Sequence, residues 1–166
     1  GHCIPIDPLY LSWKLKTLDY TARFIELAST INSSMPQYVV EKITETLNRV
    51  RKSVNGSKIL VLGVAYKRNV SDTRESPALD ILGLLQRKGA EVSYTDPHVP
   101  ELDLPGGALQ SYDPEQGYAA FDLGIIVTDH KAFDYKRLLR EAPLVFDTRN
   151  ATKGLPIPDS CTVVKL

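Results

Sequence analysis

The sequence predicts an α/β protein in which a helical segment precedes a doubly wound, mostly parallel, Rossmann-like sheet. Two observations predict this class. Apolar residues recur at helical spacing from Leu9 to about Arg51, and after Gly56 they form short runs that alternate with amphipathic segments. Strands that alternate with helices at this spacing favour right-handed βαβ units in an open sheet. We therefore expect a helical segment over residues 1–55 and a Rossmann-like domain over residues 56–166.

The helical segment is expected to contain two helices. Its apolar positions are Phe24, Leu27, Ala28, Ile31, Val39, Val40, Ile43, Leu47 and Val50. The stretch from Asn32 to Pro36 predicts a break, because Ser34 suits an N-cap and Pro36 suits the first turn of a second helix. We expect that second helix to end near Gly56.

The second part of the chain is expected to alternate strands and helices. The run from Lys58 to Val64 is almost continuously apolar, as in a strand buried on both faces. An amphipathic helix is expected to open at Ser76 and to stop at Lys88 and Gly89. The remaining expected elements are strands over 91–97, 121–128 and 144–147, a short helix over 135–141, and a short last strand over 161–164.

Composition and charge exclude several classes of function. The chain has 166 residues, of which 43% are hydrophobic, and its 20 basic residues balance its 20 acidic ones. No overall charge therefore favours nucleic acid or an anionic membrane as a partner. No apolar run approaches the roughly 20 residues of a membrane span, and the N-terminus does not resemble a signal peptide, so we expect a cytoplasmic protein. Cys3 and Cys161 lack companions at metal-ligand spacing, so we expect no metal site.

Charged residues gather where the expected strands end, and ligands of open parallel sheets bind beyond the carboxyl ends of the strands. The residues expected there are Lys67, Asp96, Asp129 and Arg149. Lys67, Arg68 and Arg74 share one loop ahead of a helix N-terminus, and cations with free helix N–H groups suit phosphate oxygens. The same loop is also consistent with a solvated surface on which Asp72 and Glu75 are ordinary partners.

The first eight residues contain a cysteine and a carboxylate with two interpretations each. A free cysteine such as Cys3 is usually a small buried hydrophobic residue, and a reactive one needs surroundings that favour the thiolate. The residues around Cys3 look more like a shaped loop than a core strand. Asp7 is available for proton transfer, and it equally suits the cap of a helix ahead of Pro8.

Two long motifs resemble the UDP-glucose/GDP-mannose dehydrogenase family. They are GHCIPIDP at residues 1–8 and GVAYKRNVSDTRESP at residues 63–77, in the order and at the separation found in that family. The stretches GHCIPIDPLYLSWK, RFIELASTINSSMP, YTDPHVP and TDH are most similar to bacterial UDP-N-acetylglucosamine 6-dehydrogenases. The resemblance covers the whole chain, as the end of the central helical domain followed by the C-terminal nucleotide-sugar domain.

The resemblance implies a role for each candidate site residue. Cys3 matches the nucleophile of a four-electron oxidation of the sugar C6 alcohol to a carboxylate, which uses two NAD molecules and passes through a thiohemiacetal and a thioester. Asp7 matches an acidic residue implicated in water activation or proton handling. Lys67 matches a lysine that contacts the UDP-sugar, and Arg149 falls in a segment near the uridine and the sugar. Arg74 matches an arginine that reaches the NAD phosphates.

The resemblance also implies what this chain does not do alone. The N-terminal Rossmann domain of the family, with its glycine-rich loop, has no counterpart in the sequence, and residues 63–67 lack the G-x-G-x-x-G pattern. We therefore expect the isolated chain to bind nucleotide sugar without turning it over. The family forms dimers through its central helix, and the apolar stripe from Phe24 to Val50 exceeds what one small sheet covers, so we expect a homodimer.

Two other interpretations stay open. The chain can be a non-catalytic nucleotide-binding or dimerisation module in which Cys3 is inert. A thiol-dependent aldehyde dehydrogenase or acyltransferase shares the nucleophile but gives no reason for the segment from Lys67 to Pro77. The sequence leaves N-acetylglucosamine, N-acetylmannosamine, N-acetylgalactosamine and glucose open as the sugar.

Overall fold

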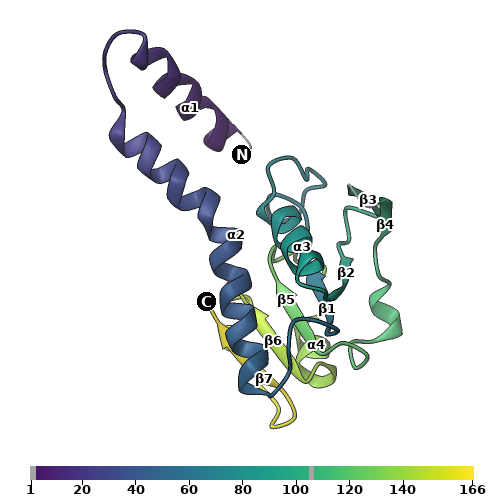
Figure 1. Cartoon of the computed structure of the whole chain (residues 1–166). Helices are drawn as coiled ribbons and strands as arrows, with labels where there is room; N and C mark the ends of the chain where they lie inside the picture. Colours follow the sequence, from purple (N-terminus) through teal and green to yellow (C-terminus); the bar gives the residue numbers. More distant parts are fainter. Residues whose placement is uncertain (1–2, 105–106) are drawn as a thin grey trace.

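Two helices precede a five-stranded parallel sheet, as the sequence predicts (Figure 1). The computed structural model describes residues 3–104 and 107–166, with side chains from residue 6 onward within these ranges. The helices are α1 (Cys3–Lys16) and α2 (Arg23–Arg49). The strands lie in the order β2-β1-β5-β6-β7, and every neighbouring pair is parallel.

The expected strands and helices of the sheet domain are confirmed. The strands are β1 (Lys58–Leu62), β2 (Glu91–Thr95), β5 (Leu123–Ile126), β6 (Leu144–Asp147) and β7 (Thr162–Lys165), and the helices are α3 (Pro77–Arg87) and α4 (Tyr135–Glu141). The Ser76 side chain caps α3 by accepting from the N–H of Ala78 at 3.4 Å, and Gly89 follows the helix with a φ of 85°.

Two short elements were not predicted. An antiparallel hairpin joins β3 (Glu101–Leu104) to β4 (Gly107–Gln110), and a 3-10 helix, η1, spans Pro114–Gln116. Leu102 is the buried residue of β3, while β4 lies mostly at the surface. Such short strands carry too few apolar positions to produce a periodic signal, so the sequence pattern missed them.

The expected break at Asn32–Pro36 is wrong, because α2 runs through this stretch without interruption. The Oγ atoms of Ser33 and Ser34 donate to the carbonyls of Ser29 and Ile31, both at 2.8 Å, so these serines bond back to the helix and do not cap it. Pro36 removes one N–H from the helix interior, and the helix continues because the turns that follow bury Val40, Ile43 and Leu47 in the core. The actual turn between the helices lies at residues 17–22, and α2 ends at Arg49, before the predicted Gly56.

The expected loop over residues 1–8 is also different, because α1 begins at Cys3 and contains Pro8. The cap interpretation of Asp7 is therefore wrong, since this residue lies inside the helix. Pro5 falls in the first turn, where the N–H groups have no partner within the helix, so its ring removes no bond there. Residues 1–2 and the side chain of Cys3 lie outside the described part of the chain.

The helical hairpin of α1 and α2 extends from the sheet domain (Figure 1). Ser12 Oγ donates to Glu26 Oε1 at 3.1 Å, and Lys16 Nζ lies 2.7 Å from the same oxygen. Among the described helices, none is long and apolar enough to cross a membrane.

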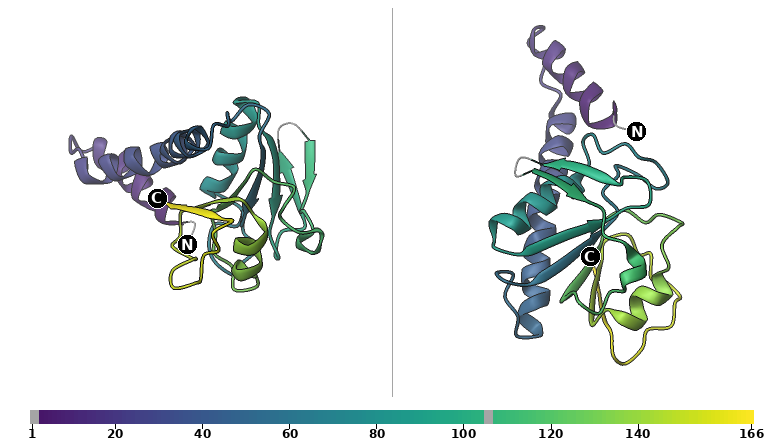
Figure 2. Two further views of the ribbon diagram at one scale, coloured as in Figure 1. Left: turned by 90° about the horizontal axis from the view of Figure 1, so that it is seen from below. Right: turned by 90° about the vertical axis from the view of Figure 1, so that its right-hand side faces the viewer.

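Helices cover both faces of the sheet (Figure 2). Alternate residues of β1 point to opposite faces, so Ile59 and Val61 belong to one apolar core and Leu60 and Leu62 to the other. The C-terminal half of α2 joins α3 over the first face, where Ile43 and Leu47 are fully buried. On the second face α4 packs with the segment around Tyr118 and Phe121.

The carboxyl ends of three strands are joined by the side chain of Asp96, which follows β2 and is 4% exposed. Its Oδ2 accepts hydrogen bonds from the N–H groups of Val64 at 2.8 Å and Ala65 at 3.1 Å, in the loop after β1. The same oxygen lies 3.0 Å from Nε2 of His130, which follows β5. Oδ1 accepts from the N–H of His98 at 2.8 Å.

His130 extends this network into the loop after β1. Its Nδ1 accepts from the N–H of Asn69 at 2.9 Å, so the ring proton is on Nε2 and is donated to Asp96. Asn69 has a φ of 60°, and its Oδ1 accepts from the N–H of Lys131 at 3.0 Å. Both side chains of the Asp96–His130 pair are fully buried. Burial alone raises the pKa of Asp96. The four hydrogen bonds that its carboxylate accepts, from His130, His98, Val64 and Ala65, outweigh burial and hold the pKa below its ordinary value.

The first prediction concerns Asp96→Asn. An amide cannot accept all of these hydrogen bonds, so we expect the variant to lose about 2–4 kcal/mol of unfolding free energy at pH 7. Because the folded pKa of Asp96 is lowered, its stabilisation is present above the unfolded pKa of about 3.9 and is lost as the pH falls through the folded value. The stability gap to wild type is therefore expected to narrow below about pH 4, measured by urea unfolding at a series of pH values.

The matched control is Asp159→Asn, which changes an exposed carboxylate and is expected to leave stability unchanged. A gap between wild type and Asp96→Asn that is absent at pH 7, or that stays constant down to pH 2, contradicts the assigned role of Asp96.

Candidate functional site

The candidate site lies at the carboxyl edge of the sheet, where the loops after β1, β2, β5 and β6 meet. Each of these loops contributes one of the residues that the sequence places there. They are Lys67, Asp96, Asp129 and Arg149. Asp96 is absorbed into the buried network described above, while Lys67 and Arg149 are exposed.

Asp129 joins two arginines that come from different loops. Its carboxylate forms an ion pair with Arg68 Nη2, and its other oxygen lies 3.6 Å from Arg149 Nε. Arg68 Nε also donates to the backbone carbonyl of Asp129 at 2.9 Å. The Asp129 side chain is 9% exposed, whereas those of Arg68 and Arg149 are 52% and 54% exposed. The two guanidinium groups are therefore anchored on one carboxylate and still accessible to a ligand.

Asp147, the last residue of β6, shapes the loop that carries Arg149. Its Oδ1 accepts from the N–H groups of Arg149 at 3.0 Å and Ala151 at 3.1 Å. Its Oδ2 accepts from the N–H of Thr152 at 2.8 Å and from the hydroxyl of the same residue at 2.6 Å. Burial raises the pKa of Asp147, but these hydrogen bonds lower it by more than burial raises it, so the pKa stays below its ordinary value. The backbone around Arg149 is thus fixed by a buried anion.

The loop between β1 and α3 places Lys67, Arg68 and Arg74 in different surroundings. The N–H of Tyr66 donates to the Asp72 carbonyl at 2.7 Å, which closes the segment containing Lys67 and Arg68. Arg74 Nε and Nη2 each lie 2.9 Å from the carboxylate of Asp72, with the arginine side chain 71% exposed. The interpretation in which Asp72 is a partner of the basic residues therefore holds for Arg74, while Arg68 pairs with Asp129.

The loop after β1 does not fit the pyrophosphate of a dinucleotide. The N–H groups of Val64 and Ala65, which open this turn, are already donated to the Asp96 carboxylate. A Cβ atom at Gly63 would lie 2.2 Å from the carbonyl oxygen of Thr128, so this glycine permits close packing against the chain after β5. Its φ of 83° also requires glycine. The turn directly after β1 therefore does not form a dinucleotide site among the described residues.

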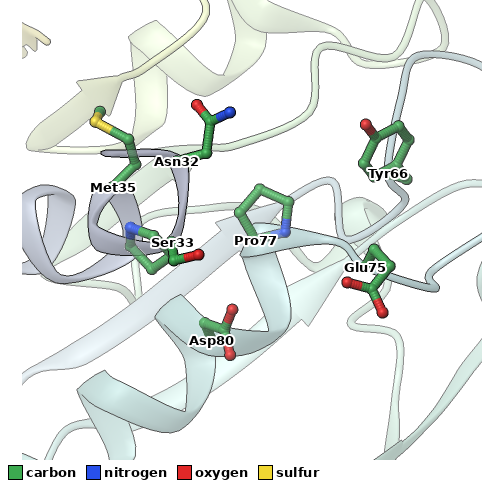
Figure 3. Close-up of a pocket in the computed structure, with 8 residues that line it drawn as sticks. Asn32, Ser33, Met35, Tyr66, Glu75, Pro77 and Asp80 are labelled. Atoms are coloured by element: carbon green, nitrogen blue, oxygen red, sulfur yellow. The ribbon is translucent and has the colours of Figure 1, made fainter. Parts of the chain in front are cut away.

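Two of the clefts beside α2 are also lined by Glu75 from the loop ahead of α3, and neither is lined by Arg68 or Arg149. One, of about 390 Å³, opens between α2 and the start of α3, and its charged lining residues are Glu75 and Asp80 (Figure 3). Two carboxylates repel phosphate, so this cleft does not suit a nucleotide diphosphate. The other, of about 440 Å³, is lined by Pro8 and Leu9 of α1, by α2 and by Glu75.

The second cleft is the place where the two sequence motifs meet. Pro8 belongs to the motif that contains Cys3 and Asp7, and Glu75 belongs to the motif that contains Lys67 and Arg74. Asp7 is exposed on α1, and the side chain of Cys3 lies outside the described part of the chain. The structure thus brings residues of the two motifs to one cleft.

Arg68 was expected among the loop cations that suit phosphate, but its pairing with Asp129 was not predicted, and neither was a role for Asn69, which contacts His130 and Lys131. The bridging position of Asp129 was missed too. The available signal was the triplet Thr128-Asp129-His130 directly after a buried strand, since polar residues at that position face the edge where ligands bind. Spacing cannot show that Asp129 turns to two arginines while His130 turns inward.

Residues 60–154 match the UDP binding domain of the UDP-glucose/GDP-mannose dehydrogenase family. The chain is 34% identical over 158 residues to a UDP-N-acetyl-D-mannosamine dehydrogenase from Methanococcus maripaludis, covering 90% of this chain and 34% of the relative. It is 30% identical over 139 residues to a UDP-N-acetyl-D-glucosamine 6-dehydrogenase from Pseudomonas aeruginosa, covering 80% of this chain and 32% of that relative.

The structure of a UDP-D-ManNAc dehydrogenase from Pyrococcus horikoshii superposes with a TM-score of 0.79 and 28% identity, covering 99% of this chain and 38% of that one. The chain spans about a third of the length of the curated relatives it matches. The resemblance drawn from the two motifs is confirmed at the level of the family. The chain belongs to the UDP-glucose/GDP-mannose dehydrogenase family and contains the UDP-binding domain of that family.

Proposed function

We propose that the chain is the nucleotide-sugar-binding part of an NAD-dependent UDP-sugar 6-dehydrogenase. The substrate proposed for the whole protein is UDP-N-acetylglucosamine or a related UDP-sugar. The observation that carries the proposal is the meeting of Arg68 and Arg149 on Asp129 at the carboxyl edge of the sheet, with the exposed Lys67 next to Arg68 in the chain, in a UDP-binding domain. Relatives named for N-acetylmannosamine and for N-acetylglucosamine both support a 2-acetamido sugar.

Lys67 and Arg149 are proposed to hold the nucleotide diphosphate. Both side chains are exposed at an edge where the loop backbones are fixed by buried carboxylates, Asp96 for one and Asp147 for the other. A guanidinium group presents paired donors to phosphate oxygens, and an ammonium group adds a point charge. The division of the chain at residues 55 and 56 into a helical part and a sugar-nucleotide domain stays part of the proposal.

Cys3 and Asp7 are proposed as the catalytic nucleophile and the carboxylate that handles protons or water. The support is the shared cleft, which brings Pro8 of their motif beside Glu75 of the other motif. NAD supplies the hydride acceptor when it is bound in the whole protein. The contribution of this chain to NAD is limited in the proposal to Arg74, whose exposed guanidinium group suits a phosphate oxygen.

A homodimer through α2 is also part of the proposal. The outward side of the helix carries Phe24, Leu27, Ile31 and Tyr38, and Phe24 is 88% exposed. The C-terminal half of α2 is buried by the sheet domain, so the chain itself leaves this apolar stripe uncovered in its described part. A symmetric partner would bury the same stripe on both copies.

The second prediction tests nucleotide binding by calorimetry with UDP-N-acetylglucosamine. We expect the chain to bind, and Lys67→Ala and Arg149→Ala each to weaken binding roughly ten-fold, because each removes a charged hydrogen bond to the diphosphate. The matched control is Lys88→Ala, at the end of α3 on the opposite edge of the sheet, and its affinity should equal that of wild type. If no uridine ligand binds to the wild-type chain, the proposal for this domain is wrong.

The third prediction concerns the two cysteines. Burial raises the pKa of the Cys161 thiol, so this residue should react slowly with iodoacetamide. We expect Cys3 to react faster and UDP-N-acetylglucosamine to change the rate at Cys3 alone, with both sites followed by peptide mass spectrometry. Cys3→Ser controls for the assignment of the signal. Equal rates at both cysteines, unaffected by the ligand, favour the alternative of a non-catalytic nucleotide-binding module.

The fourth prediction is that Phe24→Glu dissociates the dimer. A charge placed in an apolar interface is not compensated, while on a free surface it costs little, so the variant should sediment as a folded monomer. Gln37→Glu adds the same charge to another exposed position of α2 and should leave the dimer intact. A wild-type chain that is already monomeric in sedimentation equilibrium, or a Phe24→Glu variant that stays dimeric, contradicts the proposed interface.

A further inference from the structure

Two arginines that meet on one carboxylate, Arg68 and Arg149, do not by themselves select the nucleotide sugar over free UDP. Free UDP contains every group of a UDP-sugar except the sugar. The terminal phosphate of UDP has a pKa near 6, so the whole UDP molecule carries about three negative charges at pH 8. In the nucleotide sugar the terminal phosphate is a diester, and the diphosphate carries two. Cations alone attract the more highly charged anion more strongly. A site built only from Lys67, Arg68 and Arg149 would therefore favour free UDP.

Asp129 lies where it opposes this preference. Its two carboxylate oxygens contact the two guanidinium groups, one as the ion pair to Arg68 and the other 3.6 Å from Arg149 Nε. Any phosphate bound by these arginines lies close to the Asp129 charge, which is shielded from solvent because the side chain is 9% exposed. Repulsion from a fixed charge grows with the charge of the ligand, so it affects free UDP more than the diester.

The other two carboxylates of this edge do not act in this way. Asp96 and Asp147 accept their hydrogen bonds mainly from backbone N–H groups, and both are buried behind the loops. Their charge is balanced by amide dipoles that point at them. Of the three carboxylates, Asp129 is the one whose oxygens meet the side chains proposed to bind phosphate.

We propose that Asp129 is a specificity-determining residue that lowers the affinity of the site for free nucleoside diphosphate relative to the nucleotide sugar. The inference rests on the proposed function, because it requires that the arginines bind the diphosphate. Asp129 also keeps the arginines in place, but Arg68 has a second anchor that does not depend on the carboxylate. Its Nε donates to the backbone carbonyl of residue 129 at 2.9 Å.

That second anchor makes Asp129→Asn a suitable test. The amide has the shape of the carboxylate, keeps one oxygen for a guanidinium group and removes the charge. Dissociation constants for UDP and UDP-N-acetylglucosamine are measured by calorimetry at pH 8 and low ionic strength. We expect both ligands to bind more tightly, UDP more so, and the ratio of the UDP to the UDP-N-acetylglucosamine dissociation constant to fall about three- to ten-fold.

Two control variants and one substitute variant accompany this test. Asp129→Glu keeps the charge and should keep the wild-type ratio. Asp122→Asn removes a carboxylate that pairs with Lys52 and accepts from the N–H of Lys58, at the amino edge of the sheet, and should also keep the ratio. Asp129→Ser offers a second neutral side chain if circular dichroism shows that Asp129→Asn has lost its fold.

The outcomes separate the two proposals. A fall in the ratio for a neutral residue at position 129, which shrinks as salt is added, supports the selectivity role. An unchanged ratio, with both ligands still binding, overturns it and leaves the nucleotide-sugar site standing. Equal weakening of both ligands also overturns it, because Asp129 then acts only by positioning the arginines. Binding of neither ligand to the wild-type chain removes the proposed function and this inference together.

Discussion

The buried carboxylate of Asp96 is the constraint on which the carboxyl edge of the sheet depends. It follows β2, yet its hydrogen-bond donors come from the loop after β1, from the segment after β5 and from its own turn. A buried anion without such donors would cost several kcal/mol. With them it holds the three strand ends in one arrangement, and His130 passes that constraint on to Asn69, two residues after Lys67.

Three carboxylates at this edge have different structural roles because their hydrogen-bond and ion-pair partners differ. Asp96 fixes the loop after β1, and Asp147 fixes the loop after β6 by accepting from three backbone N–H groups and one hydroxyl. Asp129 is left to the side chains of Arg68 and Arg149. Asp96 and Asp147 therefore hold the loop backbones of the site in place, while Asp129 contacts the arginine side chains. The pyrophosphate-binding turn of a dinucleotide fold is unavailable here for the same reason, since Asp96 already occupies its N–H groups.

The sequence was most informative where one physical signal dominated. Continuous apolar runs located β1, β5 and β6, and Ser76 with Pro77 located the start of α3, because burial and capping leave marks on adjacent residues. It was misleading at Ser34 and Pro36, where residues typical of a helix start lie inside a 27-residue helix. Packing of Val40, Ile43 and Leu47 in the core outweighed the local preference of Pro36 there.

The sequence predicts which residues lie at the strand ends, but it does not predict which of their side chains contact one another. Lys67, Asp96, Asp129 and Arg149 were expected at the strand ends, because parallel strands all end at the same edge of the sheet. Which carboxylate turns inward depends on donors that lie 31 to 34 residues away in the sequence, such as Ala65 and His130 for Asp96. Periodicity within one segment contains no information on such contacts.

The continuity of α2 bears on how the two motifs are held together. Its C-terminal half, with Val40, Ile43 and Leu47 fully buried, is part of the core that supports the sheet, while its N-terminal half packs on α1. A helix without a break transmits the position of one end to the other, so α1 is oriented by residues of the sheet domain. Pro8 and Glu75 line one cleft together with residues of α2, so the cleft lies where the helical hairpin meets the loop ahead of α3. For the proposed chemistry this matters, because a nucleophile at Cys3 can act on a sugar held by Lys67 and Arg149 only if the distance between the motifs is fixed.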